Sequence, residues 1–415
     1  MCDTLCSVQP GRTLFAKNSD RPLSEVQLIE SFGRRAPDGP LRTQYLSIPD
    51  PGAAAVLGAR PAWLWGFEHG VNEHRVAIGN EKLFTALDPA SVEPAFIGMD
   101  LVRLGLERAA SADQALEVIT ALLADHGQGG VADQTTDDPY FSSFLVVDPT
   151  GGWVLETSGR SWAARPVGDG AAISNRISLS TDWTRASTDL APGDDWDRFR
   201  DPEAWLGIAD KRLECTAPVA AAREPLPTPR DLAATLRHHG TRSWGRPGGP
   251  PDELEPLPHP DLGADGSGVT VCFHIRGFQA TTSAMVAELP VSPDEPLRAW
   301  VAPGAPCVSA FVPVFPPDPA PPELADERTW HRFATLRAQV EGPVSTFDDP
   351  IPWDAEASTG RLADIRAVLG PVEAELWDEA DALVASSAVS DPTRRAELVA
   401  SAWPRLDAAL TRLGV

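Results

Sequence analysis

The sequence has few lysines, no long hydrophobic segment and a large deficit of positive charge. Only three of its 35 basic residues are lysines (Lys17, Lys82 and Lys211), and 59 acidic residues leave a net charge of −24. Nucleic acids and anionic membrane surfaces bind clusters of lysine and arginine. No apolar segment reaches the roughly 18 residues of a membrane-spanning helix. We therefore expect neither a nucleic-acid partner nor a membrane-bound protein.

The cysteines and the short motifs exclude further classes. There are five cysteines, an odd number, and no CxxC pair, so a disulfide framework or a zinc ribbon is not expected. GxGxxG, the P-loop and HExxH are all absent, and the eight histidines are scattered. The chain opens Met-Cys-Asp-Thr, without the basic and apolar regions of a secretory signal. These features predict a cytoplasmic protein with reduced thiols, no cofactor and no metal.

The 415 residues, 42% of them hydrophobic, suffice for a large core or two to three domains of about 150 residues. The pattern predicts hairpins, then a helix pair, further hairpins and a helical tail, and therefore a mixed α/β fold with mostly antiparallel sheets. Helices are predicted at 94–110, 111–127 and 228–240 and, with breaks at 350–353, 370–371 and 391–392, from 327 to the end. Strands are predicted at 2–19 (a hairpin turning at Pro10-Gly11), 26–31, 45–48, 53–58, 75–79, 143–148, 153–157, 162–167, 172–179, 269–275, 281–289, 298–301 and 311–315. The loop that extends to residue 265 and the segment 316–326 are rich in proline and aspartate, and we interpret the second as a linker.

Cys2 follows the initiator methionine, and a small residue at this position allows the methionine to be removed. A mature chain beginning with cysteine would carry a thiol with pKa ~8.5 and an α-amine with pKa ~7.7–8.0 on one residue. The amine can accept the thiol proton, so nucleophile and general base need no histidine partner. The alternative interpretation is a frayed terminus without a function.

Lys17 and Asp20 lie at the far end of the predicted hairpin, in the segment Phe15-Ala16-Lys17-Asn18-Ser19-Asp20. A turn at Pro10-Gly11 returns residues 17–20 to the neighbourhood of Cys2. There Lys17 would favour the thiolate and Asp20 would orient the α-amine. The alternative is a solvated charged turn.

A series of motifs follows in order along the chain. They are CDTL and FAKNSDRP with EVQ (2–27), RPAWLWG (60–66), G-NEH-VAIGNE (70–81), GMDLVRLGLERA (98–109), HGQGG (126–130), SFLVVD with WVLET (143–157), ISNRISL (173–179) and, more loosely, TTSAMV (281–286). Taken together, these motifs resemble the secernin family, which is related to the dipeptidase A peptidases among the N-terminal-nucleophile (Ntn) cysteine hydrolases. The resemblance covers residues 2–180 closely and 268–316 weakly.

The resemblance implies an α+β fold, a four-layer αββα Ntn-hydrolase sandwich of two antiparallel sheets between helical layers. It implies a catalytic domain at 2–318 and leaves 327–415 as a helical C-terminal extension, which offers a packing surface for a homo-oligomer. It also implies that Cys2 hydrolyses a small peptide or amide substrate. Asn175 would donate to the oxyanion by motif context, with Asn80 as the candidate second donor. More distantly, the bile-salt hydrolase and penicillin V acylase branch has arginine where this chain has Lys17, and lysine cannot make the bidentate contact of arginine.

Other functions stay open at this point. The leading prediction is a dipeptidase that uses Cys2. The alternatives are an acyl-amide hydrolase or acyltransferase acting on a non-peptide substrate, and a non-catalytic secernin-like regulatory protein. Cys6, four residues along the same strand, lacks a free amine and is interpreted as a packed core thiol. A Cys-His enzyme using Cys272 or Cys307 would lack any local signature in the sequence.

Overall fold

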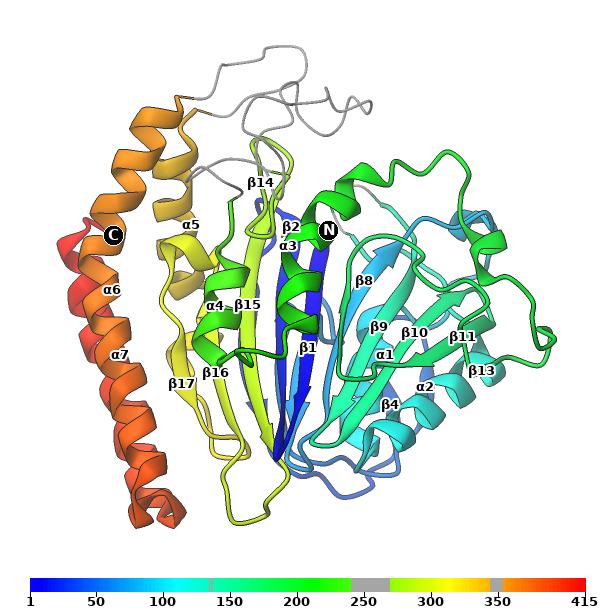
Figure 1. Ribbon diagram of the computed structural model, residues 1–415, viewed down its shortest axis with the longest axis horizontal. Helices are drawn as coiled ribbons and strands as arrows, with labels where there is room; N and C mark the ends of the chain where they lie inside the picture. The colour runs from blue at the N-terminus through cyan, green and yellow to red at the C-terminus, as the bar shows by residue number, and fades with distance from the viewer. Residues whose placement is uncertain (134, 136, 240–268, 344–353) are drawn as a thin grey trace.

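The computed structural model describes residues 1–133, 135, 137–239, 269–343 and 354–415, and its centre is a pair of antiparallel β-sheets (Figure 1). The chain's first hairpin, β1 (Cys2–Gln9) and β2 (Arg12–Pro22), lies inside one of them. This seven-stranded sheet has the order β12-β1-β2-β15-β16-β17, and β14 pairs with β15. The remaining bounds are β12 (Gly170–Ile173), β14 (His274–Ile275), β15 (Gln279–Pro290), β16 (Arg298–Pro303) and β17 (Val312–Val314).

The second sheet has eight strands in the order β13-β11-β10-β9-β8-β7-β6-β3. Consecutive strands are mostly neighbours, as expected for segments joined by short turns. The bounds are β3 (Gln27–Phe32), β6 (Val56–Pro61), β7 (His69–Asn72), β8 (Ala77–Leu83), β9 (Phe141–Asp148), β10 (Gly151–Ser158), β11 (Ser161–Pro166) and β13 (Arg185–Ala186). A separate small ribbon joins β4 (Pro40–Arg42) and β5 (Ser47–Pro49).

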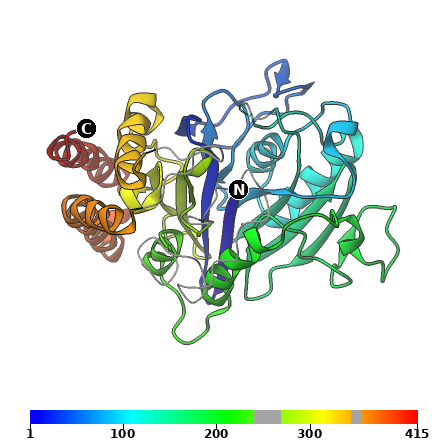
Figure 2. The same ribbon diagram turned by 90° about the horizontal axis from the view of Figure 1, so that it is seen from above.

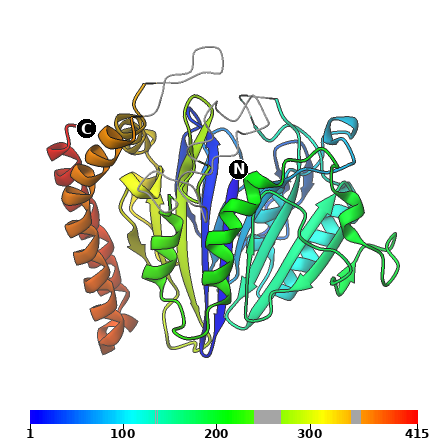
Figure 3. The same cartoon turned by 45° about the horizontal axis from the view of Figure 1, so that its top comes forward.

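Helices cover the outer face of each sheet. Side chains of α1 (Gly98–Arg108) and α2 (Ala112–His126) pack on the eight-stranded sheet, in a cluster with Ile78 and Val146. Side chains of α3 (Gly207–Ala221) and α4 (Pro229–Leu236) pack on the seven-stranded sheet, and Figure 3 shows these two helices in front of its strands. The largest apolar cluster fills the space between the two sheets. The layers are therefore helix, sheet, sheet and helix, which confirms the predicted α+β sandwich.

The C-terminal helices α5 (Glu327–Glu341), α6 (Ala355–Ala385) and α7 (Pro392–Arg412) flank the sandwich, as the view from above shows (Figure 2). The predicted break at 370–371 is wrong, because α6 continues through Pro371. Ile365, Leu369, Val372 and Leu376 are all buried in the largest apolar cluster, which extends from the layer between the sheets to the C-terminal helices. Their helical spacing keeps one apolar stripe on the core across the proline, and this packing compensates for the missing backbone donor.

Three further comparisons with the predicted elements are informative. The break at 391–392 is confirmed, since α7 begins at Pro392. The predicted strand 172–179 ends at Ile173, because the Asn175 side chain, not its backbone, accepts the N–H of Cys2. The helix α3 was not predicted, and its Pro218 obscures the helical pattern. The predicted break at 350–353 and most of the loop up to residue 265 lie outside the described residues.

No helix in the described part of the chain has the length and apolarity needed to cross a bilayer.

Candidate active site

The Cys2 residue lies in the wall of a cavity of about 760 Å³ at the start of β1. Cys2 is buried, with 5% of its surface exposed to solvent. Among the described residues, the cavity wall is rich in carboxylates and has two basic side chains. These lining residues are Asp20, Glu68, Asp133, Asp137, Asp138, Asp201 and Glu203, with Arg21 and Lys82 as the basic ones. Such a wall favours a ligand that carries positive charge.

The register of the first hairpin places Lys17 on the same face of the sheet as the Cys2 thiol. Thr4 pairs with Lys17 and Cys2 pairs with Ser19. Directly opposed residues in an antiparallel pair share a face, and so do residues two apart along a strand. Cys2, Thr4 and Lys17 therefore point into the layer between the two sheets. The predicted return of residue 17 to the neighbourhood of Cys2 agrees with this placement.

Lys17 is completely buried and is paired with the second sheet. Its Nζ donates to the carbonyl oxygen of Asn80 (2.5 Å) and lies 3.4 Å from Glu81 Oε1. Its stem passes over Gly79, where an added Cβ would lie 2.5 Å from Lys17 Cδ. The alternative of a solvated charged turn is thus wrong for Lys17. The partner of the lysine is Glu81, not Asp20.

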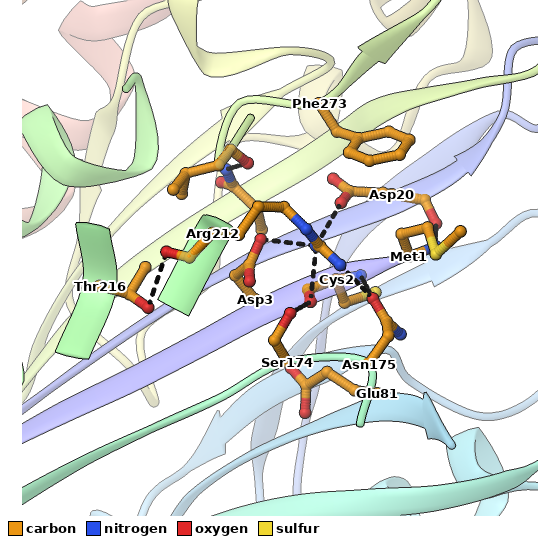
Figure 4. Close-up of polar contacts among 12 residues, drawn as sticks. Met1, Cys2, Asp3, Asp20, Glu81, Ser174, Asn175, Arg212, Thr216 and Phe273 are labelled. Atoms are coloured by element: carbon orange, nitrogen blue, oxygen red, sulfur yellow. Dashed lines mark hydrogen bonds and ion pairs between the residues drawn. The ribbon is translucent and has the colours of Figure 1, made fainter. Parts of the chain in front are cut away.

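Asp20 lies on the opposite face of the hairpin, because its position differs from that of Lys17 by an odd number of residues. It faces Asp3 and the α3 side chain Arg212 (Figure 4). Arg212 Nη1 lies 2.7 Å from Asp3 Oδ2 and 3.6 Å from Asp20 Oδ2. Thr281 Oγ1 donates to Asp20 Oδ1 at 2.6 Å. Lys17 and Asp20 therefore lie on different sides of the strand that begins at Cys2, not together around the thiol.

Arg212 is the site residue that the sequence analysis missed. It is buried, and besides Asp3 it donates to the Cys2 carbonyl oxygen at 3.0 Å and to Asn175 Oδ1 at 2.6 Å. Sequence offers little to single out one of many arginines, since Arg212 is 210 residues from Cys2 along the chain. The available signal was local: Ile208, Arg212 and Thr216 recur every four residues and are all buried in α3.

Asn175 follows the end of β12 and holds the backbone nitrogen of Cys2. Its Oδ1 accepts from the Cys2 nitrogen at 2.9 Å and from Arg212, and its Nδ2 donates to the Lys82 carbonyl oxygen at 3.0 Å. Two donors at one end of the amide and an acceptor at the other fix its orientation. Asn175 thus contacts the Cys2 nitrogen, which becomes the α-amine once Met1 is removed. Donation to an oxyanion stays a prediction.

Asn80 lies on β8 and lines the cavity together with Cys2. Its Nδ2 has one contact, 3.5 Å to the Met99 sulfur, which is a weak acceptor. The amide therefore has donor capacity to offer a substrate oxygen. An added Cβ at Gly98, the first residue of α1, would lie 2.7 Å from this Nδ2. Glycine at position 98 leaves room for the Asn80 amide.

Burial and nearby charges act on the titratable groups in opposite directions. Burial raises the pKa of the Cys2 thiol, while the Lys17 ammonium and the terminal ammonium counteract this rise and Glu68 adds to it. Burial also raises the pKa of Asp20 to about 6 and that of Glu81 to about 7. Burial raises the pKa of Cys6 to about 12, and this thiol lies fully buried in the inter-sheet cluster, as expected for a core thiol.

No protein-family model matches the chain, so membership of the secernin family stays a prediction. Three solved structures are similar at low identity. Penicillin V acylase from Agrobacterium tumefaciens has 9% identity and a TM-score of 0.44, over 77% of this chain and 87% of that one. A mutant conjugated bile acid hydrolase from Clostridium perfringens has 10% identity and a TM-score of 0.41, over 72% and 88%. The Caenorhabditis elegans ortholog of N-acylethanolamine-hydrolyzing acid amidase has 11% identity and a TM-score of 0.38, over 71% and 94%. Similarities of this size assign neither residue roles nor a substrate to this chain.

Proposed function

We propose that the protein is an N-terminal cysteine hydrolase of C–N bonds, and specifically a dipeptidase. The observation that carries the proposal is the position of the Cys2 nitrogen. It donates to Asn175 Oδ1 at 2.9 Å, while the same residue lies in the cavity wall. Removal of Met1 would turn this nitrogen into an α-amine that is already held beside the thiol. Nucleophile and general base would then both be provided by Cys2.

The mechanism begins with transfer of the Cys2 thiol proton to the α-amine. The sulfur attacks the scissile carbonyl carbon, and the carbonyl oxygen becomes an oxyanion that accepts hydrogen bonds from Asn80 and Asn175. One such donor typically contributes about 10²–10³ in rate. The α-ammonium of Cys2 then gives its proton to the leaving nitrogen as the C–N bond breaks. Water, deprotonated by the amine, hydrolyses the thioester and releases the free thiol.

The contacts of Met1 support a substrate with a free amino terminus. The Met1 ammonium donates to the Asp20 carbonyl oxygen at 2.9 Å and to Gln279 Oε1 at 3.1 Å, and the Asp20 N–H donates to the Met1 carbonyl oxygen. Loss of Met1 would leave these polar groups needing new partners, since buried backbone groups are nearly always paired. The first residue of a peptide substrate offers the same ammonium and carbonyl. The carboxylate-rich wall also favours a cationic amine over an acyl chain.

The first experiment tests the nucleophile. Purified protein is analysed by intact mass to determine whether Met1 is present, and hydrolysis of a dipeptide panel is compared for wild type, Cys2→Ala and the matched core variant Cys6→Ala. We expect Met1 to be absent, Cys2→Ala to be inactive with an unchanged far-UV spectrum, and Cys6→Ala to be active. Full activity in a preparation that retains Met1, or in Cys2→Ala, would contradict the proposal.

The second experiment tests the substrate class. Each dipeptide is compared with its N-acetyl derivative in wild type and in Gln279→Leu. We expect wild type to prefer the free amine, and Gln279→Leu to raise KM for the dipeptide only. Hydrolysis of N-acyl amides in preference would support the acyl-amide alternative instead. A folded protein that binds but hydrolyses neither class would support a regulatory role.

A third experiment separates the role of Asn175 in binding from its role in the transition state. Asn175→Ala should lower kcat by about 10²–10³ with a much smaller change in KM. An unchanged kcat would remove Asn175 from the catalytic machinery.

A further inference from the structure

Four buried side chains outside the cavity wall bring two thiols and two imidazoles together. They are His239, Cys272, His274 and Cys307, and their ligand atoms all lie within 4.8 Å of one another. Three separate segments supply them: the end of α4, the segment around β14, and the short 3₁₀ helix Pro306–Val308. The absence of a CxxC pair predicts no metal site, and this cluster is at odds with that prediction. Cys272-x-His274 was the one local signal, since alternate residues of an extended segment share a face.

From this cluster we infer a structural zinc site in which Cys272, Cys307, His239 and His274 are the four ligands. The inference concerns a part of the molecule that the proposed hydrolysis does not use. Two thiolates and two imidazoles are a ligand set typical of closed, tetrahedral structural zinc. Two thiolates also neutralise the divalent cation, so the buried site carries no net charge.

Two of the distances between ligand atoms are near the edge length of a zinc tetrahedron. His274 Nε2 lies 3.2 Å from Cys272 Sγ and 3.4 Å from Cys307 Sγ. Zinc bonds of about 2.3 Å to sulfur and about 2.05 Å to nitrogen give a sulfur–nitrogen edge of roughly 3.6 Å. Both thiols thus lie close to the same imidazole nitrogen. A shared cation accounts for both.

The surroundings of His274 are those of a metal ligand. Its Nδ1 lies 2.8 Å from Glu341 Oε1, and Glu341 in turn lies 3.8 Å from Arg337. A carboxylate at Nδ1 fixes the proton there and leaves the Nε2 lone pair directed at the thiols, the usual outer-shell arrangement of zinc-bound histidine. The Cys-His-Glu geometry also resembles a catalytic triad. However, both thiols are buried and neither lines the cavity that contains Cys2.

Zinc would fix the segment that covers the outer face of the candidate active site. Phe273, between two of the ligands, has its ring 5.4 Å from the Arg212 guanidinium. The Phe273 N–H donates to Thr281 Oγ1, which donates to Asp20 Oδ1. The metal would also join residues on both sides of 240–268, because His239 precedes this stretch and Cys272 follows it. The zinc would therefore hold in place the segment that packs against Arg212 and Asp20.

The decisive measurement is the zinc content of the full-length protein, purified without added metal or chelator, by elemental mass spectrometry. We expect one zinc per chain in wild type and in the control Cys215→Ser, and a loss of most of it in Cys307→Ser. Cobalt substitution should give the absorption bands of a tetrahedral site with thiolate ligands. A cobalt spectrum without thiolate-to-metal bands would overturn the inference.

Wild type decides the matter even if Cys307→Ser fails to fold. Modification of its thiols in the presence of a zinc-sensitive dye should release zinc, and the melting temperature should then fall. Wild type that contains no zinc and takes none up after reduction would overturn the inference. So would a stable Cys272–Cys307 disulfide, seen as an intact mass two daltons lower.

Discussion

Replacing Lys17 by methionine tests whether its ammonium tunes the nucleophile. Methionine keeps an unbranched stem over Gly79 and removes the charge. The Lys17 ammonium is the largest influence that lowers the pKa of the Cys2 thiol against the effect of burial. In Lys17→Met the pKa of Cys2 should therefore rise, and less thiolate should be present at any given pH.

The size of the effect follows from Coulomb's law. Two unit charges about 4 Å apart at an effective dielectric constant near 20 interact with about 4 kcal/mol, which corresponds to about three pKa units. Glu81 reduces the effect. Its pKa is about 7 even beside Lys17, so without the lysine it takes up a proton and removes a negative charge from the same layer. We expect a net rise of about one to three units, that is, alkylation slowed about 10- to 1000-fold at pH 8.

The assay is the pH dependence of Cys2 alkylation by iodoacetamide. A Cys6→Ala background leaves one thiol in the tryptic peptide that ends at Arg12. The charge of Lys17 is isolated by comparing Lys17→Met/Glu81→Gln with Glu81→Gln, because neither variant contains an ionisable Glu81. Superimposable alkylation profiles for this pair would refute the reasoning. Lys17→Arg should be impaired despite its charge, because the fully buried position that holds the compact ammonium against the Asn80 carbonyl would have to accept a larger planar guanidinium.

Three further outcomes follow from other parts of the structure. Arg212→Lys keeps the charge but loses the fork that contacts Asp3 and Asn175, so kcat should fall about 10- to 100-fold at nearly constant KM; a kcat within twofold of wild type would contradict this. Gly98→Ala should displace the Asn80 amide and lower both kcat and the melting temperature, because the added Cβ would lie 2.1 Å from Ser142 Oγ. In the control Gly360→Ala no atom lies within 4 Å of the added Cβ, so the melting temperature should not fall. Burial raises the pKa of Asp100 to about 7, so the folded state retains a proton that the unfolded state releases near pH 4. The free energy of unfolding therefore falls as the pH rises from about 4 to about 7. In Asp100→Asn this fall should be shallower by up to roughly 3 kcal/mol, measured by urea unfolding at pH 4.5 and 7.5; equal slopes in the two proteins would refute the assignment.

The opening hairpin was predictable because its register depends on local chemistry. Pro10-Gly11 supplies a turn, and Gly11 adopts a φ of +85°. With the turn fixed, the approximate position of Lys17 beside the first residues of β1 followed from counting. The face on which each charge lies also follows from counting, since Lys17 and Asp20 differ by three positions. Proximity along the hairpin groups the two charges together, and only the alternation of side chains separates them.

Contacts between distant segments could not be predicted in the same way. Glu81 meets Lys17 only because the two sheets stack, and Arg212 reaches Cys2 only because α3 packs on the outer face. The four residues of the zinc cluster span 69 residues of sequence and three elements. No spacing within a single helix or strand encodes such a group. Only the Cys272-x-His274 pair was local enough to be recognised.

The alternation of the first strand gives the two functional groups of Cys2 different electrostatic environments. Its side chain points into the layer between the sheets, where Lys17 is the charge that most lowers the pKa of the thiol. Its nitrogen, which would be the chain end after removal of Met1, donates a hydrogen bond to Asn175. Arg212 and Asp20 lie nearby on the outer face of the sheet. A change in the inner layer should therefore shift thiol reactivity with little effect on the amine, and a change on the outer face should do the reverse. The strand thus gives the base and the nucleophile on one residue different surroundings.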